Sequence, residues 1–221
     1  MARILLTSGP TREYLDPVRY LSNASSGRMG RALAAAALAA GHEVVIVSGP
    51  VEVDYPAGAE VIRVVSTQEM LDACLAAFAR CDGVIGVAAP CDYRPARVSA
   101  QKLSKTGRSL RLELSETPDI VAALAAQRTP QWIVAFALET GDGRARALKK
   151  LYEKHCDLIV LNGPEAIHRD RTEVEVLDPG GNVLASLSGA KDQVAEGVFR
   201  IIEERLVLGH RGRCGESGTG S

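Results

Sequence analysis

The sequence predicts a single α/β domain of Rossmann-like, doubly wound architecture, with a mainly parallel sheet, helices on both faces and a β-hairpin extension. Residues 4–6 and 44–47 are apolar runs of strand length. Between them, residues 29–40 are rich in Ala and Leu and end at Gly41, as a helix does. Because strand, helix and strand follow in order, these segments are predicted to form the first β-α-β unit.

Local patterns predict the remaining elements. Thr67 is expected to cap one helix, and Thr117 with Pro118 to open the next as N-cap and first-turn proline. Leucines alternate over residues 110–114, which is typical of an edge strand. The other expected elements are strands over residues 61–65, 84–88, 132–138 and 157–161, helices over residues 144–154 and 191–206, and a β-hairpin over residues 172–186.

Composition excludes several classes of protein. A formal net charge of -1 over 221 residues argues against a general nucleic-acid binder. The five cysteines are scattered and lack CxxC spacing, so neither a disulfide framework nor a zinc site is indicated. With no secretory signal and no run of roughly twenty apolar residues, we expect a cytoplasmic protein that binds no membrane. We expect one domain over residues 1–208 and a disordered, Gly- and Ser-rich tail over residues 209–221.

The connection between the first strand and its helix is long. About seventeen polar or irregular residues intervene, where a dinucleotide-binding fold turns within a few residues, and such a loop is often functional. Ser25, Ser26 and Gly27 stand where the helix begins, so hydroxyls and unpaired backbone N–H groups converge at the positive end of the helix dipole. We expect this point to hold an anion such as phosphate.

A second long segment, AAPCDYRPARVSAQKLSKTG, follows the strand over residues 84–88. Since ligands bind outside the carboxyl ends of parallel strands, this loop and the Asn23 loop are expected to face each other. Asn23 could shape its loop as an Asx-turn or donate its amide to a carboxylate or phosphate. Asp92 and Lys102 could form a surface salt bridge; alternatively, Asp92 could hold Mg²⁺ or a ribose hydroxyl, and Lys102 with Lys105 could neutralise a polyphosphate.

Other candidate residues have simple structural interpretations when taken alone. Lys150 and Lys154 fit a solvated helix face, Phe136 fits the core, and Asp119 fits a favourable charge at a helix start. The sequence has no GxGxxG after its first strand, no GxxxxGK[ST] and no YxxxK. A Rossmann-like layout therefore implies neither NAD nor a P-loop here.

Together, these segments resemble a known family. The ordered set DPVRYLSNASSGRMG, AAPCDYRP, QKLSKTG, TPDIVAAL, VAFALET and LIVLN closely resembles the phosphopantothenoylcysteine synthetases, the synthetase part of the bifunctional coenzyme A biosynthesis flavoproteins, over about residues 3–206. The resemblance implies an amide ligase that uses CTP and Mg²⁺ and no flavin. The phosphopantothenate carboxylate attacks the α-phosphorus of CTP, pyrophosphate leaves, and the cysteine amine then displaces CMP from the acyl-cytidylate.

The resemblance also implies roles for individual residues. Asn23 and Lys102 match catalytic positions, and Asp92 is the expected metal ligand. The expected phosphopantothenate- or cysteine-binding residues are Arg19, Asn23, Ala89 and Asn162. The expected nucleotide-binding residues are Ser25, Ser26, Gly27, Asp92, Lys102, Lys105, Pro118, Asp119, Ile120, Val121, Phe136, Lys150 and Lys154.

Some features depart from the family pattern. Pro90 and Cys91 stand where the family usually reads AAVADYRP, and Ser104 replaces a lysine, so less positive charge faces the triphosphate. Because the chain begins at the synthetase strand, we expect a stand-alone synthetase whose decarboxylase partner is a separate chain. The resemblance implies a homodimer with the hairpin over residues 172–186 and the loop before it at its interface. The alternatives are an NAD(P)-dependent oxidoreductase and a non-catalytic nucleotide-binding subunit.

Overall fold

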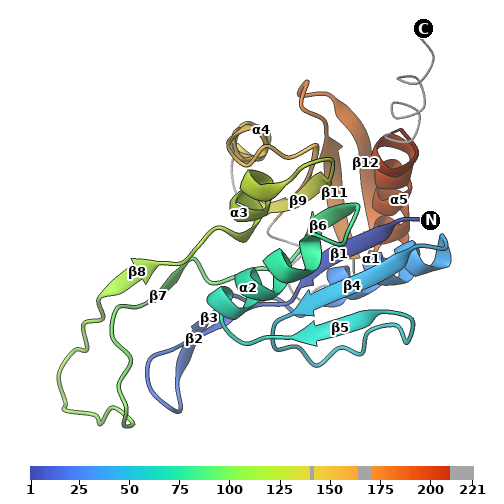
Figure 1. Cartoon of the computed structure of the whole chain (residues 1–221). Coiled ribbons are helices and arrows are strands. Elements are labelled where there is room, and N and C mark those ends of the chain that lie inside the picture. Colours follow the sequence, from blue (N-terminus) through green and yellow to red (C-terminus); the bar gives the residue numbers. More distant parts are fainter. Residues whose placement is uncertain (140–141, 164–170, 210–221) are drawn as a thin grey trace, which may run out of the picture.

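An eight-stranded sheet organises the structure, a computed structural model that describes residues 1–139, 142–163 and 171–209 (Figure 1). Its strand order is β12-β11-β10-β9-β6-β1-β4-β5. The six strands from β10 to β5 run parallel, and β11 and β12 are antiparallel to their neighbours. The strands are β1 (Arg3–Ser8), β4 (Glu43–Ser48), β5 (Glu60–Arg63), β6 (Gly83–Gly86), β9 (Trp132–Leu138), β10 (Leu158–Asn162), β11 (Arg171–Leu177) and β12 (Val183–Ala190). The predicted doubly wound, mainly parallel sheet is confirmed.

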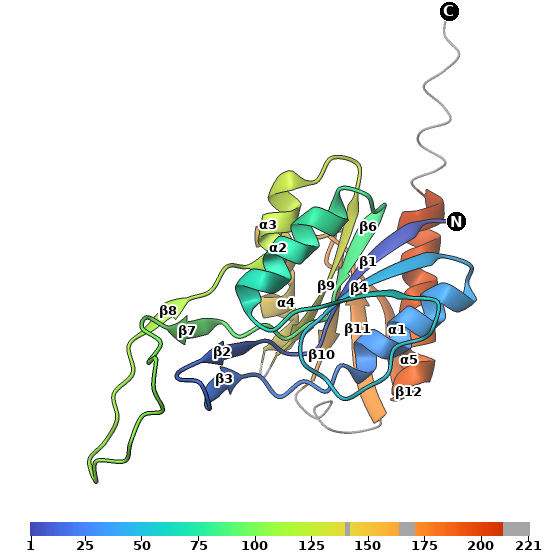
Figure 2. The ribbon, with the colours of Figure 1, turned by 60° about the horizontal axis from the view of Figure 1, so that its bottom comes forward.

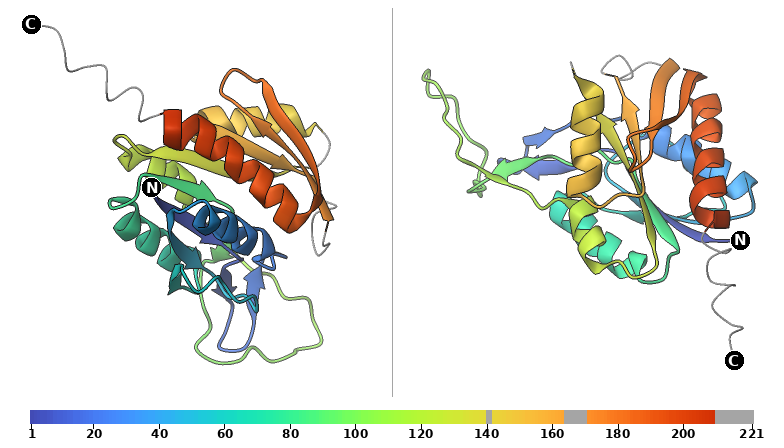
Figure 3. Two further views of the ribbon diagram at one scale, coloured as in Figure 1. Left: turned by 90° about the vertical axis from the view of Figure 1, so that its right-hand side faces the viewer. Right: turned by 90° about the horizontal axis from the view of Figure 1, so that it is seen from above.

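Helices cover both faces of this sheet (Figure 3). On one face α1 (Arg28–Ala39) and α5 (Lys191–Ile202) pack over Ile4 and Leu6, and α5 continues as a π-helical segment, Glu203–Leu208. On the other face α2 (Thr67–Phe78), α3 (Ile120–Gln127) and α4 (Gly143–Glu153) enclose Leu5. The alternation along β1 thus buries its apolar side chains in two separate cores, as a strand covered on both sides requires.

Two of the predicted helix starts are wrong. Ser66, not Thr67, caps α2, because the Ser66 hydroxyl accepts a hydrogen bond from the Glu69 backbone N–H. Asp119, not Thr117, caps α3 by accepting from the Ala122 N–H. The hydroxyls of Thr67 and Thr117 bond elsewhere, since both donate to the Cys91 carbonyl, at 3.3 and 2.6 Å.

The predicted edge strand over residues 110–114 is also wrong. Only Leu114–Glu116 (β8) forms a strand, and it pairs with Tyr93–Pro95 (β7) in a ribbon outside the main sheet. Of the alternating leucines, Leu114 lies in β8 opposite Pro95, whereas Leu110 and Leu112 lie outside the strand and Leu110 remains 62% exposed. The ribbon and the loop beyond it project from the body of the molecule as an arm, defined here as residues 93–116 (Figure 2).

The long connection after β1 contains a second ribbon, β2 (Arg12–Tyr14) paired with β3 (Tyr20–Ser22), which lies beside the base of the arm (Figure 2). The predicted C-terminal hairpin is confirmed as β11 and β12. No helix among the described residues is long and apolar enough to cross a membrane. The expected disordered tail over residues 209–221 lies outside the described residues except for Gly209, and the domain boundary stays a prediction.

Candidate functional site

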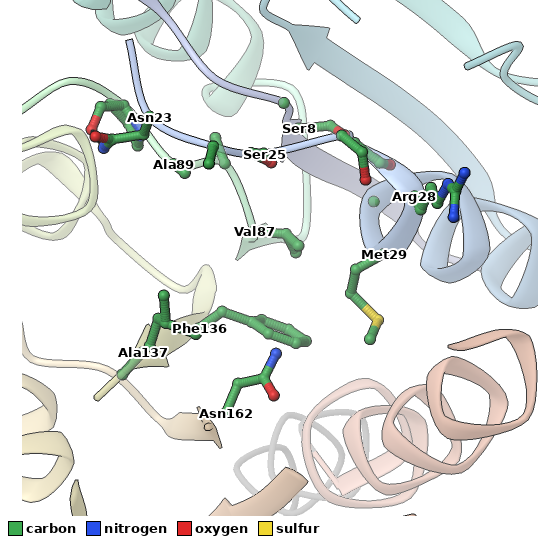
Figure 4. Close-up of a pocket in the computed structure, with 18 of the residues that line it drawn as sticks. Ser8, Asn23, Ser25, Arg28, Met29, Val87, Ala89, Phe136, Ala137 and Asn162 are labelled. Atoms are coloured by element: carbon green, nitrogen blue, oxygen red, sulfur yellow. Dashed lines mark hydrogen bonds between the residues drawn. The ribbon is translucent and has the colours of Figure 1, made fainter. Parts of the chain in front are cut away.

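A cavity of about 510 Å³ opens at the carboxyl edge of the parallel strands. The start of α1, the loop after β6 and the ends of β9 and β10 form its walls. In Figure 4, Ser25 and Ala89 lie across the opening from Phe136 and Asn162. Sequence-predicted site residues that line it are Asn23, Ser25, Ser26, Gly27, Ala89, Asp92, Phe136, Lys150, Lys154 and Asn162. The fold therefore brings together residues from five separate segments of the chain.

The start of α1 has the features of an anion site. Gly27 occupies the N-cap position with φ of 73°, and no side chain caps the helix. The first N–H groups of any helix have no intrahelical partner, and in α1 no side chain caps them. The helix dipole also places partial positive charge at the cavity wall. Arg28 also lines the cavity, which adds a full positive charge. The arrangement suits a phosphate or carboxylate.

Replacing Gly27 with alanine should lower the free energy of unfolding. The left-handed backbone disfavours any Cβ, and a Cβ on Gly27 would also lie 2.9 Å from Val51 Cγ1, so we expect a loss of about 2–3 kcal/mol. Gly41→Ala is the matched control, because Gly41 has φ of 82° but no atom lies within 4 Å of the place that a Cβ would occupy, and it should cost about 1 kcal/mol. Urea unfolding measures both losses, and equal losses would show that Gly27 is not closely packed.

The two long loops face each other, as expected. The Asn23 Nδ2 group donates a hydrogen bond to the Pro90 carbonyl at 2.8 Å. Next to it, the Cys91 N–H donates to Thr11 Oγ1 at 2.8 Å, and the Cys91 side chain is 7% exposed. Burial raises the pKa of the Cys91 thiol, so this departure from the family pattern contributes a neutral packing group. One N–H of the Asn23 amide remains for a ligand.

Lys150 of α4 and Lys154, the residue that follows this helix, are each paired with a carboxylate. Lys154 Nζ lies 2.9 Å from Asp119 Oδ2 at the start of α3. Lys150 Nζ lies 2.6 Å from Glu139 Oε1, directly after β9. Both lysines line the cavity. Their positive charges are therefore held at its wall by acids that belong to neighbouring elements.

A second cavity of about 490 Å³ adjoins the first. The two share Ala88, Pro90, Asp92, Phe136 and Lys154 as lining residues. The turn that opens α3 lines only the second cavity, through Pro118, Asp119, Ile120 and Val121. Apart from Lys102 and Lys105, the expected nucleotide-binding residues thus divide between two adjoining spaces, with Asp92 and Lys154 lining both.

Three predicted site residues lie outside both cavities. Arg19 contacts Asp16 and the Leu103 carbonyl, which ties the β2–β3 ribbon to the arm. Lys102 and Lys105 are exposed on the arm and line neither cavity. A single copy of the chain therefore does not bring the predicted catalytic lysine to its own pocket.

Asp16 stabilises this tie and was not anticipated from the sequence. Its side chain is 0% exposed, and burial opposes its ionisation. Hydrogen bonds from the Arg19 side chain and from the Val18, Leu103 and Arg19 backbone N–H groups outweigh burial and hold the pKa of the carboxyl well below its usual range. The signal for this role in the sequence is an acidic residue, Asp16, with an arginine, Arg19, three residues later.

A bound metal ion would rely on few protein ligands. No group of three or more His, Cys, Asp or Glu side chains in the described segments could hold one. Asp92 lines both cavities, and Mg²⁺ in nucleotide enzymes commonly takes one or two carboxylates plus substrate phosphates. A lone Asp92 fits that mode of binding.

Fold and site together define a doubly wound α/β protein with a two-part pocket at the carboxyl edge of its sheet, and basic side chains outnumber acidic ones in the lining of the first part. Residues 1–206 match the family described as the DNA/pantothenate metabolism flavoprotein C-terminal domain. The chain belongs to this family, which confirms the resemblance drawn from its motifs.

Similar proteins agree with this assignment. A coenzyme A biosynthesis bifunctional protein CoaBC of Vibrio parahaemolyticus is 45% identical over 212 residues, covering 93% of this chain and 52% of that protein. The chain thus spans about half the length of the curated relatives it matches. The crystal structure of a CoaBC C-terminal domain is 35% identical, with a TM-score of 0.79 and coverage of 93% of this chain and 96% of that one. A Cab2 mutant in complex with phosphopantothenate-cysteine is 16% identical, with a TM-score of 0.75 and coverage of 98% and 89%, and has the same fold.

Proposed function

We propose that the chain is a phosphopantothenate–cysteine ligase that uses CTP and Mg²⁺ in coenzyme A biosynthesis. The observation that carries the proposal is the two-part pocket, in which an uncapped helix start, Asn23 and two lysines converge beside a separate space for a base. The relatives named as coenzyme A biosynthesis proteins support it. So does the related fold that holds phosphopantothenate-cysteine.

The residues have distinct tasks in this reaction. The α3 turn and Phe136 hold the nucleoside in the second cavity, while Lys150, Lys154 and the start of α1 hold the phosphates. Asn23 donates its remaining amide N–H to the activated acyl group, and Ala89 and Asn162 border the acid and the cysteine. Mg²⁺ held by Asp92 supplies charge neutralisation for the phosphates. Catalysis then consists mainly of positioning and electrostatic stabilisation.

We also propose that the enzyme is a homodimer whose arms complete the sites. Lys102 lies on the arm and lines neither cavity, and Val98, Leu110, Leu112 and Leu114 on the arm are 43 to 62% exposed. Such a cluster of exposed apolar side chains marks an interaction surface. A second copy covers it and receives Lys102 at its pocket. The hairpin interface expected from the resemblance is the alternative to the arm interface, and most of the loop before the hairpin lies outside the described residues. A separate decarboxylase chain stays a prediction.

A pair of charge substitutions distinguishes the two interfaces. Leu110→Glu with Leu112→Glu should convert the dimer to a monomer and reduce turnover at least tenfold, because two carboxylates cannot be buried in an apolar contact. Val183→Glu, at a side chain 40% exposed on β12, should leave the dimer intact. Analytical ultracentrifugation measures the mass. A monomeric Val183→Glu protein beside a dimeric arm variant would place the interface on the hairpin.

Pyrophosphate release tests the function directly. We expect release with CTP, phosphopantothenate, cysteine and Mg²⁺, and none when phosphopantothenate or Mg²⁺ is omitted. The same assay with ATP measures the nucleotide preference. Tight NADPH binding without CTP binding in calorimetry would favour an oxidoreductase, and CTP binding without pyrophosphate release would favour a non-catalytic subunit.

A further inference from the structure

Glu139 occupies a buried position at the carboxyl edge of the sheet. It follows β9 directly, and its backbone N–H donates to the Asn162 carbonyl at the end of β10 at 3.1 Å. Its side chain is only 7% exposed. The backbone of Glu139 is thus anchored between two strand ends, beside cavity residues Leu138 and Asn162.

The closest charged partner of this carboxylate is a cavity lysine. Glu139 Oε1 lies 2.6 Å from Lys150 Nζ, whereas Arg146 Nη1 is 3.9 Å from Oε2. In the described part of the chain, Oε1 is buried and has no hydrogen-bond partner of standard geometry, so the Lys150 charge is its main compensation. A buried carboxylate interacts strongly with such a charge because water screens the pair poorly.

Lys154, the other lysine with a carboxylate partner at the first cavity, is held differently. Asp119, the partner of Lys154, is 44% exposed and also caps α3 through its other oxygen, Oδ1. Water screens that pair more, and removing Asp119 would disturb a helix start. Glu139 caps no helix, and none of its described side-chain contacts reaches beyond α4. Its carboxylate therefore acts chiefly on the position of Lys150.

We propose that Glu139 is a positioning residue that fixes the Lys150 amine at the cavity wall, where it meets the nucleotide phosphates. This proposal rests on the proposed function, because it assigns the phosphates to the Lys150 wall. Lys150 itself is 44% exposed and flexible by nature, so without the buried acid its charge has no fixed location. The carboxylate thereby lowers the ordering cost of phosphate binding.

Glu139→Gln keeps the size of the side chain and removes its charge. We expect the KM and the calorimetric Kd for CTP to rise roughly tenfold, as for loss of other groups that orient a ligand-binding residue. The KM for cysteine should not change. In a Lys150→Gln background, Glu139→Gln should raise the Kd for CTP by less than a further twofold, because the lysine that Glu139 positions is absent. Glu139→Asp keeps the charge, so its Kd for CTP should lie between those of the wild type and Glu139→Gln. It replaces Glu139→Gln as the test if the Gln variant does not fold.

The matched control is Glu153→Gln, which breaks the exposed Lys149–Glu153 pair, 3.7 Å apart, on the same helix. It should leave CTP affinity unchanged. A wild-type CTP affinity in Glu139→Gln, or an equal loss in both backgrounds, would overturn the proposal even if thermal stability falls. If the wild-type enzyme releases pyrophosphate, either of these results overturns only the role of Glu139 and not the proposed function. Absence of both turnover and CTP binding in the wild type would overturn the two together.

Discussion

Replacing Lys102 with glutamine is expected to slow pyrophosphate release by about 10²-fold, the size of effect seen when one preorganised charge is removed from a transition state. The lysine lies exposed on the arm and packs against little, so the unfolding free energy should stay within about 0.5 kcal/mol of wild type. Steady-state kinetics should show the loss mainly in kcat, because the charge serves the phosphates as pyrophosphate leaves.

Arg108→Gln is the control for this substitution. Arg108 is another exposed cation on the same arm, so a general effect of arm charge would slow both variants equally. We expect Arg108→Gln to keep nearly full activity. An unchanged kcat in Lys102→Gln would reject its catalytic role and remove the main reason for placing the arm of one copy at the pocket of another.

Asn23→Asp should reduce product formation by about 10²- to 10³-fold. The new carboxylate cannot donate to the Pro90 carbonyl, which now accepts from Asn23 Nδ2 at 2.8 Å. It also puts a negative charge beside the anionic intermediate. Since residue 23 is exposed, the loss should appear in single-turnover formation of the acyl-cytidylate and not in unfolding.

Asn23→Ala separates the two causes. It removes the amide donor without adding charge, so it should be impaired less than Asn23→Asp. Equal activity of the two variants would mean that charge repulsion plays no part. Normal product yield from Asn23→Asp would refute the assignment of Asn23 altogether.

Much of the fold follows from local pattern, because the buried strands are continuous apolar runs and the helices end at clear signals such as Gly41. The helix starts at α2 and α3 were harder. Ser66 and Thr67, or Thr117 and Asp119, are all good N-cap residues, and contacts to the Cys91 carbonyl decide which of them bonds elsewhere. Tertiary contacts therefore determine which residue caps each helix, and N-cap propensity alone does not.

The pocket lining was predictable where a motif lies in a loop at the carboxyl edge of the sheet, as at Asn23, Ser25 and Asp92. It was not predictable where side chains pair across the fold. Glu139 and Lys150 meet only because β9 and α4 pack together. Nothing in the sequence pattern VAFALET indicates that the Glu139 carboxylate is buried. The strand over residues 110–114 was misassigned for a related reason, since alternation cannot show how far a partner strand extends.

The most direct test of this account is a crystal structure of the protein with CTP and Mg²⁺. The account predicts the triphosphate at the start of α1, within contact of Lys150 and Lys154, and the base in the adjoining cavity lined by Pro118 and Val121. Nucleotide bound elsewhere, with both cavities vacant, would contradict it.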